Sequence, residues 1–340
     1  MALETLEFLA GLAIVWIALR DVFDTVVVPG EARGPLRMSR RLVDLALPAQ
    51  RRMFPGGVGL SFAPLVLLAS FVAWMALLVL GFGLMTHAER DSFDPPARSF
   101  GEALYLAGTA LTTVGFGTSN PTGLASVLGV VGGFCGLAVM TMAVTYLLQV
   151  QANIAARDVG IVKLITAAGH PPSAVVLLER YAELGCRDEL ASLLRSARDW
   201  CAAVLQSHAS HPSLIYFRSA GVGSGWPATL GAVVDFALMA EHLLAVPDLR
   251  GPAVLARQEG EALARELARL LHLAPVAPAA TAADMAQVTQ RLSQAGYALR
   301  TTDLQAFAEE RRKRICCIEA LARHLGTGST VLAPRDDEHG

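Results

Sequence analysis

The residue types with the clearest chemistry lie in one short run, residues 112–118, which reads Thr-Thr-Val-Gly-Phe-Gly-Thr. Its two glycines, Gly115 and Gly117, alternate with larger residues. Glycine visits left-handed backbone angles cheaply, so the alternation lets a strand point successive carbonyl oxygens to one side. Stacked rings of such oxygens can replace the water shell of a dehydrated potassium ion. The run therefore predicts cation sites built from backbone atoms.

The side chains of this run have expected roles of their own. The Thr113 hydroxyl adds one more oxygen ring at the inner end of the strand. Val114 and Phe116 are expected to pack behind the strand and hold its diameter, and Thr112 and Thr118 to support it. The alternative is an ordinary surface turn. The segments on either side of the run favour the first interpretation.

The segment before the run predicts a short helix. Ser99 and Glu102 have the spacing of a capping box, in which a hydroxyl and a carboxylate satisfy free amides at a helix start. Residues 103–112 then form a helix too short to cross a bilayer. A half-length helix followed by a glycine-rich strand at membrane depth must be buried in protein or line a watery path, because lipid offers its backbone no partners.

Three stretches are apolar and long enough to cross a membrane: residues 5–28, 62–85 and 124–150. The chain is 53% hydrophobic and 17% charged, which favours a membrane protein. The first stretch also carries charges, and we expect Arg20 and Asp24 to pair one helical turn apart near one interface. A role of this pair in gating is the alternative.

The order of span, short helix, Thr-Val-Gly-Phe-Gly and span resembles the pore module of tetrameric potassium channels over residues 62–150, most closely the bacterial two-transmembrane type. The resemblance implies an all-α membrane protein that conducts potassium passively as a homotetramer and is not an enzyme. It implies potassium ions bound by backbone oxygens, and no organic cofactor is evident. The residues that it assigns to the filter are Thr113, Val114, Gly115, Phe116 and Gly117.

Two positions depart from the usual pattern of these channels. Thr118 stands where an aspartate is usual, and Thr109 stands where some relatives place a glutamate on the pore helix. A carboxylate pair behind the filter is therefore absent. The departure bears on the stability and inactivation of the filter, and it leaves the expected ion sites unchanged.

The third span is expected to be the inner helix that lines the pore. Gly129 and Gly133, and likewise Gly132 and Gly136, form small-xxx-small pairs typical of closely packed membrane helices. The alternative for Gly136 is a hinge that opens the inner mouth, as glycine hinges do in the resembled family. Residues 146–150 are expected near that mouth, where apolar rings can gate by dewetting.

Arginine bias predicts the orientation in the membrane. The connection of residues 31–60 is rich in arginine, whereas that of residues 86–98 holds two arginines against three acids. The positive-inside rule then places the N-terminus outside the cell's inner membrane and the C-terminal half in the cytoplasm. The arginines of the first connection lie outside any apolar run, so we do not expect a voltage-sensing helix.

The second half of the chain predicts a helical cytoplasmic domain. Apolar residues recur at helical spacing in residues 174–184, 190–205, 227–246, 254–273 and 304–325. Glycine and proline pairs, among them Gly251-Pro252, are expected to separate these helices. The expected division is an N-terminal transmembrane helix (1–30), an arginine-rich cytoplasmic linker (31–61), the pore module (62–150), a helical regulatory domain (155–326) and a flexible tail (327–340).

Other signals in this half are weaker. Residues 221–226 are glycine-rich, and we interpret them as a flexible loop, with anion or ligand binding as the alternative. His208 and His211 have a spacing that suits a metal, but they are expected to be exposed at a helix end. An unknown cytoplasmic ligand therefore remains a possible partner, beside the lipid bilayer. The net charge of −2 argues against nucleic acid.

Other functions stay open at this point. The chain could be the pore-forming subunit of a potassium uptake system, or a weakly selective cation channel. It could also be a signalling or enzymatic protein whose activity resides in residues 155–340, although that half shows no nucleophile–base pair, acid pair or phosphate loop.

Overall fold

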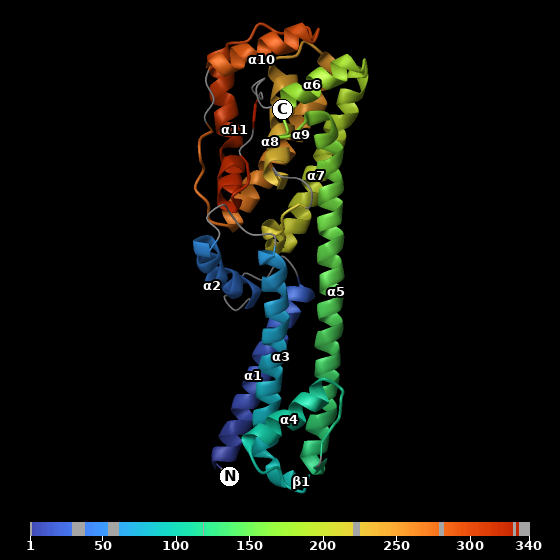
Figure 1. Ribbon diagram of the computed structural model, residues 1–340, viewed down its shortest axis with the longest axis vertical. Helices are drawn as coiled ribbons and strands as arrows, with labels where there is room; N and C mark the ends of the chain where they lie inside the picture. Colours follow the sequence, from blue (N-terminus) through green and yellow to red (C-terminus); the bar gives the residue numbers. More distant parts are fainter. Residues whose placement is uncertain are drawn as a thin grey trace. The chain divides into compact units, whose positions relative to one another are not determined.

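The computed structural model describes residues 2–28, 38–53, 61–117, 119–219, 225–278, 282–328 and 331–332 (Figure 1). Most of these residues are helical, and the protein is an all-α membrane protein. The chain divides into two compact units. The first comprises Met1–Ala49 with Ala63–Val150, and the second comprises Gln50–Phe62 with Gln151–Gly340.

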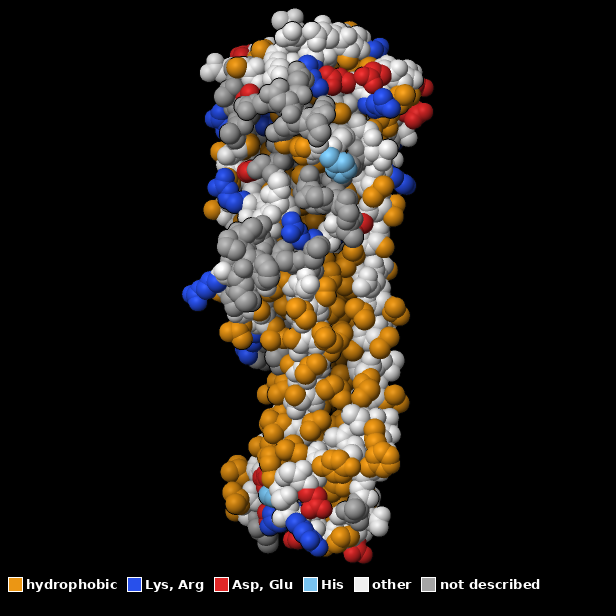
Figure 2. Space-filling view, viewed as in Figure 1, with side chains coloured by type: hydrophobic (Ala, Val, Ile, Leu, Met, Phe, Trp, Pro, Cys, Tyr) orange, Lys and Arg blue, Asp and Glu red, His pale blue; other side chains and the backbone are white. Residues whose placement is uncertain are grey.

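The first unit is built from long apolar helices. Among the described residues, α1 (Ala2–Val26), α3 (Phe62–Ala88) and α5 (Gly123–Ala168) are long and apolar enough to cross a membrane. They correspond to the three expected spans. Hydrophobic side chains cover much of the visible surface of this unit in Figure 2, and large ones such as Leu65 and Phe134 are exposed. Lipid is the natural solvent for such a surface.

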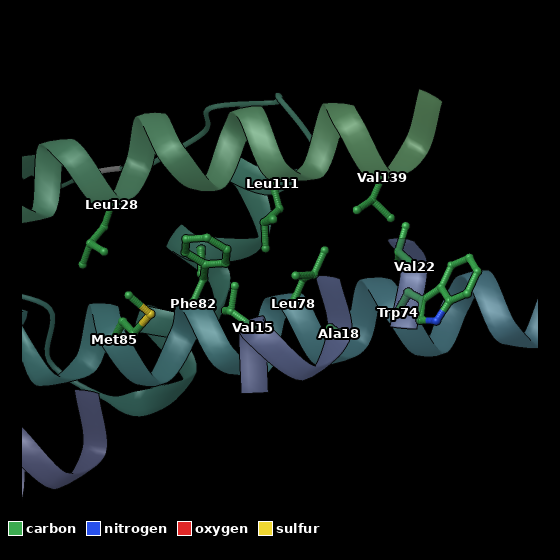
Figure 3. Close-up of a cluster of buried hydrophobic side chains, with 11 residues drawn as sticks. Val15, Ala18, Val22, Trp74, Leu78, Phe82, Met85, Leu111, Leu128 and Val139 are labelled. Atoms are coloured by element: carbon green, nitrogen blue, oxygen red, sulfur yellow. The ribbon is translucent and has the colours of Figure 1, made fainter. Parts of the chain in front are cut away.

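A buried apolar cluster joins the helices of the first unit (Figure 3). It includes Val15, Ala18 and Val22 of α1, Trp74, Leu78 and Phe82 of α3, Leu111 of α4 (Phe100–Leu111), and Val139 of α5. The backbones of α1 and α3 also approach closely, because a Cβ atom added at Gly11 would lie 2.5 Å from the carbonyl oxygen of Gly81. The N-terminal helix is therefore part of the core of this unit.

Polar contacts also tie α1 to α3. The Trp74 indole N–H donates to the buried Asp21 carboxylate over 2.5 Å. Near the other end of α1, Glu7 lies 2.8 Å from a His87 ring nitrogen. Within α1, Arg20 and Asp24 approach to 3.7 Å, which confirms the expected pair.

Helix α5 is longer than the sequence predicts. The expected span ended at residue 150, whereas the helix continues without a break to Ala168. No proline interrupts the continuation, and Gly169 (φ +76°) ends it in the left-handed conformation that commonly follows a helix. The charged residues after residue 150 mark a change of environment, and they leave the helix intact.

The second unit is a helical bundle. Helix α8 (Gly225–His242) is buried along almost its whole length and packs against α9 (Pro247–Leu270) and α11 (Leu304–Leu325). Helix α7 (Leu190–Ser210) packs against α9, and α6 (Ala174–Glu183) and α10 (Ala282–Gln294) complete the bundle. In its interior, Arg311 of α11 donates two hydrogen bonds of 2.7 Å to Asp235 of α8.

The structure departs from several sequence expectations. Gly251-Pro252 was expected to separate helices but lies inside α9. Pro252 is the sixth residue of α9, so it removes one amide donor from the second turn, and the helix continues past it to Leu270. Helix α10 was not expected, and the arginine-rich linker contains α2 (Met38–Met53). Short 3₁₀ turns (Arg90–Ser92, Arg187–Glu189 and Pro212–Tyr216) and two paired two-residue strands, β1 (Phe93–Asp94) and β2 (Asn120–Pro121), complete the described elements.

Candidate functional site

The expected short helix is present as α4, and its start is capped as the sequence predicts. The Ser99 hydroxyl accepts a hydrogen bond of 3.2 Å from the Glu102 amide. The Glu102 carboxylate accepts one of 2.7 Å from the amide of Arg98. In an ideal capping box the Glu102 carboxylate would accept from the amide of Ser99, the N-cap residue. Here the donor is the amide of Arg98, one residue earlier. Ala103, Ala107 and Leu111 form the buried face that anchors the helix.

The segment that follows α4, residues 113–117 and here called the strand, is held by the end of that helix. The amides of Val114 and Gly115 both donate to the carbonyl oxygen of Thr109, over 2.9 and 3.1 Å. The amide of Thr113 donates to the Ala110 carbonyl over 3.0 Å. The donors on this side of the strand are thus used within the chain, and they fix where the strand begins.

The carbonyl oxygens of the strand are in a different situation. Within the described part of the chain, no hydrogen-bond donor reaches the carbonyl oxygens of Thr113, Val114, Gly115 or Phe116. Residues 113–116 are all exposed in a single chain. Four successive carbonyl groups without an intramolecular donor are available to a ligand, and cation binding by them remains a prediction.

The backbone angles of the strand are unusual. Thr113 has φ +59° and Gly115 has φ +70°. Both values fall in the left-handed region, which glycine occupies at little cost and a β-branched residue such as threonine avoids. Gly115 thus has the freedom that the sequence predicts. The strained angle of Thr113 is a feature that residue type alone did not indicate.

Gly117 and the side chains of the strand differ in how closely other groups of the chain approach them. Gly117 does not adopt a positive φ, so the left-handed freedom expected of both glycines is used only at Gly115. A Cβ atom at Gly117 would lie 2.9 Å from a Leu106 methyl carbon, so this glycine allows a close approach instead. Val114 and Phe116 are 51% and 69% exposed in a single chain. The packing behind the strand that was expected of them is therefore not made within one chain. Thr118 lies outside the described residues.

The strand borders a pocket of about 220 Å³. Phe82 of α3 and Phe116 of the strand line it, together with small residues such as Ala107 of α4 and Gly132 of α5. Thr109, which stands where some potassium channels carry a carboxylate, also lines the pocket. Its hydroxyl donates to the Leu106 carbonyl of its own helix over 2.9 Å and not to the strand. The Thr112 hydroxyl likewise bonds to Gly108 of the helix over 2.8 Å.

The inner-helix glycines differ in their surroundings. A Cβ atom at Gly136 would lie 1.9 Å from the carbonyl oxygen of Leu111, the last residue of α4. One at Gly133 would lie 3.3 Å from the Ala110 carbonyl, and one at Gly129 would meet nothing within 4 Å. Close packing against the pore helix explains the need for glycine at position 136, and hinge bending there remains a prediction.

The inner end of the third span has both buried and exposed apolar residues. Tyr146 and Val150 are buried, and Tyr146 packs edge-on against Phe71 of α3 with ring centroids 6.4 Å apart. Leu148 is 65% exposed. Leu148 is thus the more available side chain for an apolar ring at the mouth.

The weaker candidates in the second unit have mixed outcomes. His208 and His211 are buried, so the expectation that they are exposed is wrong. Arg157 of α5 lies 3.4 Å from His208, a partner that sequence spacing could not reveal. No cluster of three or more potential metal-ligating side chains occurs among the described residues. Residues 221–224 lie outside them.

Comparison with known proteins agrees with this geometry. Residues 65–152 match a family model, Ion_trans_2, described as "Ion channel". The searches of curated proteins and of solved structures gave no match. The matched segment contains α4, the strand after it and most of the second and third spans, so the candidate site lies in a segment typical of ion channels with two transmembrane helices and a pore loop.

Proposed function

We propose that this chain is one subunit of a potassium-selective channel in which four copies surround one pore. Potassium ions would be coordinated by the backbone oxygens of Thr113, Val114, Gly115 and Phe116, with the Thr113 hydroxyl as an additional ligand. Conduction is passive, and the protein has no enzymatic role.

One observation carries the proposal. The amides of Val114 and Gly115 are taken by the end of α4, while the carbonyl groups of the same strand have no donor among the described residues. A cation that loses its water shell needs oxygen ligands of this kind. A single chain supplies one strand, and a ring of ligands requires several copies of it.

The remaining features give the channel an orientation. The N-terminus lies outside the cell's inner membrane and the second half of the chain lies in the cytoplasm, as the arginine bias favours. Helices α6 to α11 act as a domain that gates or assembles the pore.

Flux measurements test the proposal. The purified full chain, reconstituted into liposomes, is expected to pass potassium and to discriminate strongly against sodium, with block by barium. Comparable sodium flux would instead indicate a weakly selective cation channel. Absence of any cation flux, with correctly inserted protein, would refute the channel function itself.

Particle symmetry separates the channel from a subunit of a potassium uptake system. Such transporters carry four pore loops in one chain, whereas this sequence contains a single run of the filter type. Fourfold symmetry of the purified particle is expected for the channel. A particle that requires additional, different chains would favour the transport system.

A further inference from the structure

The part of α5 that continues beyond residue 150 is packed on one side. Helix α5 runs unbroken to Ala168 (Figure 1), and Ile161 and Leu164 are buried. A Cβ atom added at Gly160 would lie 2.0 Å from Cδ1 of Trp200 in α7, and the Trp200 indole donates to the Arg157 carbonyl over 3.0 Å. This side of the helix is therefore fixed within the second unit.

The other side of the same segment carries exposed residues at coiled-coil spacing. Leu148, Val159 and Val162 are 65%, 56% and 55% exposed. Together with three smaller exposed residues they follow one another at alternating intervals of four and three, which is the a/d pattern of a heptad repeat. We call this set the seam; it consists of Leu148, Ala152, Ala155, Val159, Val162 and Thr166.

The one polar residue of the seam has its hydrogen bond satisfied within the helix. The Thr166 hydroxyl donates to the Val162 carbonyl over 2.8 Å. Thr145, which precedes Leu148 at the same spacing, likewise donates to the Thr141 carbonyl over 3.0 Å. Bonding of this kind leaves the hydroxyl without a need for water. The seam can therefore be buried against another apolar surface without stranding a polar atom.

Two opposite charges flank the seam. Asp158 directly precedes Val159 at an a position, and Lys163 directly follows Val162 at a d position, so they occupy a g and an e position. In a parallel coiled coil in register, a g residue lies beside the e residue five places later in the neighbouring helix, which here pairs Asp158 with Lys163. An antiparallel contact would place like charges together. The charges thus favour a parallel copy of the same helix.

Both charges are available for such a pair. Lys163 is exposed, and it makes no ion pair within the described part of the chain. The Asp158 side chain is 21% exposed, and the Arg157 Nε donates to its Oδ1 over 3.0 Å. Its Oδ2 accepts no hydrogen bond from the described residues, and a carboxylate can accept from several donors. The pair can therefore form while the contact with Arg157 is kept.

The seam is too short to assemble on its own. It extends over about 28 Å of helix, fewer than the roughly three or four heptads typical of an independent coiled coil. Helix α5 also contains the third span, however, and copies joined at a pore would hold their seams at a high effective concentration. Rotation about a single pore axis also relates the copies in the parallel sense that the charges favour.

We propose that the seams of neighbouring copies of this chain pack together as a parallel coiled coil, with Asp158 of one copy beside Lys163 of the next. The partner is a second copy of the chain, so the inference rests on the proposed assembly of four subunits. It adds to the pore a second contact between copies, located on the continuation of α5.

Cross-linking of the full chain in detergent tests the contact and its direction. Ala152→Cys and Thr166→Cys each place a thiol at an a position, and the two positions are about 21 Å apart along the helix. In a parallel coil in register each position meets its own copy, so a short bismaleimide is expected to link both variants into dimers. Failure of either variant to link above background would overturn the proposed contact.

Two controls define the background of the cross-linking. The native chain reports the reaction of its own five cysteines. Leu184→Cys places a thiol at a similarly exposed apolar position, 62% exposed, outside α5. Both are expected to give few dimers. If Leu184→Cys links as fully as the seam variants, the cross-links report random collisions, and the assigned surface is refuted.

A charge placed inside the seam tests its contribution to assembly. Val159→Asp is expected to lower the temperature at which the tetramer dissociates in detergent, because the contact would bury a carboxylate without a partner. Helix content by circular dichroism should stay native, since Val159 is more than half exposed in a single chain. Leu184→Asp is the control and should dissociate as the native chain does. An unchanged dissociation temperature in Val159→Asp would contradict the proposal.

Reversal of the flanking charge tests the pairing. Lys163→Glu is expected to lower the dissociation temperature by a smaller amount, and the difference from the native chain should shrink at high salt. Lys313→Glu is the matched control, because Lys313 is an exposed lysine of α11, 4.0 Å from Glu309. Equal effects of the two reversals would exclude a specific pair at the seam.

Flux measurements separate this inference from the proposed function. Fourfold particles that pass potassium but show no cross-links at the seam would refute the seam alone. Cross-linked seams in a native chain that passes no cation would refute the channel and still support the contact between copies.

Discussion

At the scale of single residues, the backbone of the strand determines what the candidate site can do. Gly115 has φ +70°, and a Cβ atom at this position would meet nothing within 4 Å. A substitution by alanine therefore acts through backbone conformation and not through a clash within the chain. The left-handed conformation costs an L-residue about 1–2 kcal/mol, and a symmetric pore would incur that cost in every subunit.

Gly115→Ala is therefore expected to abolish potassium flux in liposomes while leaving expression close to native and lowering Tm only slightly. Gly101→Ala is the matched control, because Gly101 lies in α4 and its added Cβ would come only within 3.9 Å of the Ser99 hydroxyl. Native flux in the Gly115 variant would show that the assigned strand does not coordinate the ion.

A second prediction at this scale concerns acid stability. Burial, and then the neighbouring Arg157 charge, keeps His208 neutral in the folded chain down to a pKa of about 3, whereas histidine in the unfolded chain is protonated below its ordinary pKa of 6.5. Between these values the unfolded state binds one more proton. Stability is therefore complete above the unfolded pKa and falls as the pH is lowered towards the folded one.

His208→Gln removes this titration and keeps a polar side chain. The loss of stability between pH 7 and pH 5 is expected to be smaller in the variant by about 1–2 kcal/mol, measured as the change in thermal unfolding. His170→Gln, at an exposed position, is the control and should behave as the native chain. An identical pH dependence in the His208 variant would contradict the assignment.

At the scale of elements, the contact between α4 and α5 sets the position of the strand. Gly136 packs against the Leu111 carbonyl at the end of α4, so the inner helix holds the point from which the strand starts. Gly136→Ala would place a methyl group 1.9 Å from that oxygen and force the helices apart. Overpacking of this kind typically costs about 1–3 kcal/mol.

The expected result of Gly136→Ala is a lower Tm together with reduced or less selective potassium flux. Gly129→Ala, in the same helix but with nothing within 4 Å of the added Cβ, should change neither quantity. A native Tm with altered gating in the Gly136 variant would favour the hinge hypothesis over close packing.

The elements also show what sequence patterns can and cannot predict. Long, mostly apolar runs predict the three spans, and the Ser99–Glu102 spacing predicts the start of α4, because both are local properties of the chain. The predicted end of α5 at residue 150 is wrong, because a rise in charge does not end a helix and Arg, Lys and Glu are good helix formers. The contact of His208 with Arg157 joins residues that are far apart in the sequence, so spacing near His208 does not reveal it.

At the scale of the whole molecule, a single chain leaves the strand incomplete. The carbonyl groups of the strand have no donors among the described residues, and the Val114 and Phe116 side chains remain more than half exposed. Additional copies of the chain would account for both features, because cyclic symmetry turns one strand into stacked rings of oxygens and brings new neighbours to its side chains. Assembly is therefore a property that can be tested through the filter itself.

Mixed assembly of native and inactive subunits provides that test. If native chain and Gly115→Ala are produced together in equal amounts and mix randomly, about one sixteenth of tetramers contain native subunits alone. Potassium flux per particle is then expected to fall to about that fraction of native flux, since one distorted strand interrupts every ring. A residual of about one quarter would indicate a dimeric pore and about one half an independent pore in each chain. Either value would overturn the fourfold assembly. As the control for random mixing, the native chain and the Gly115→Ala chain are purified and reconstituted separately, and the two sets of liposomes are then mixed before the flux is measured.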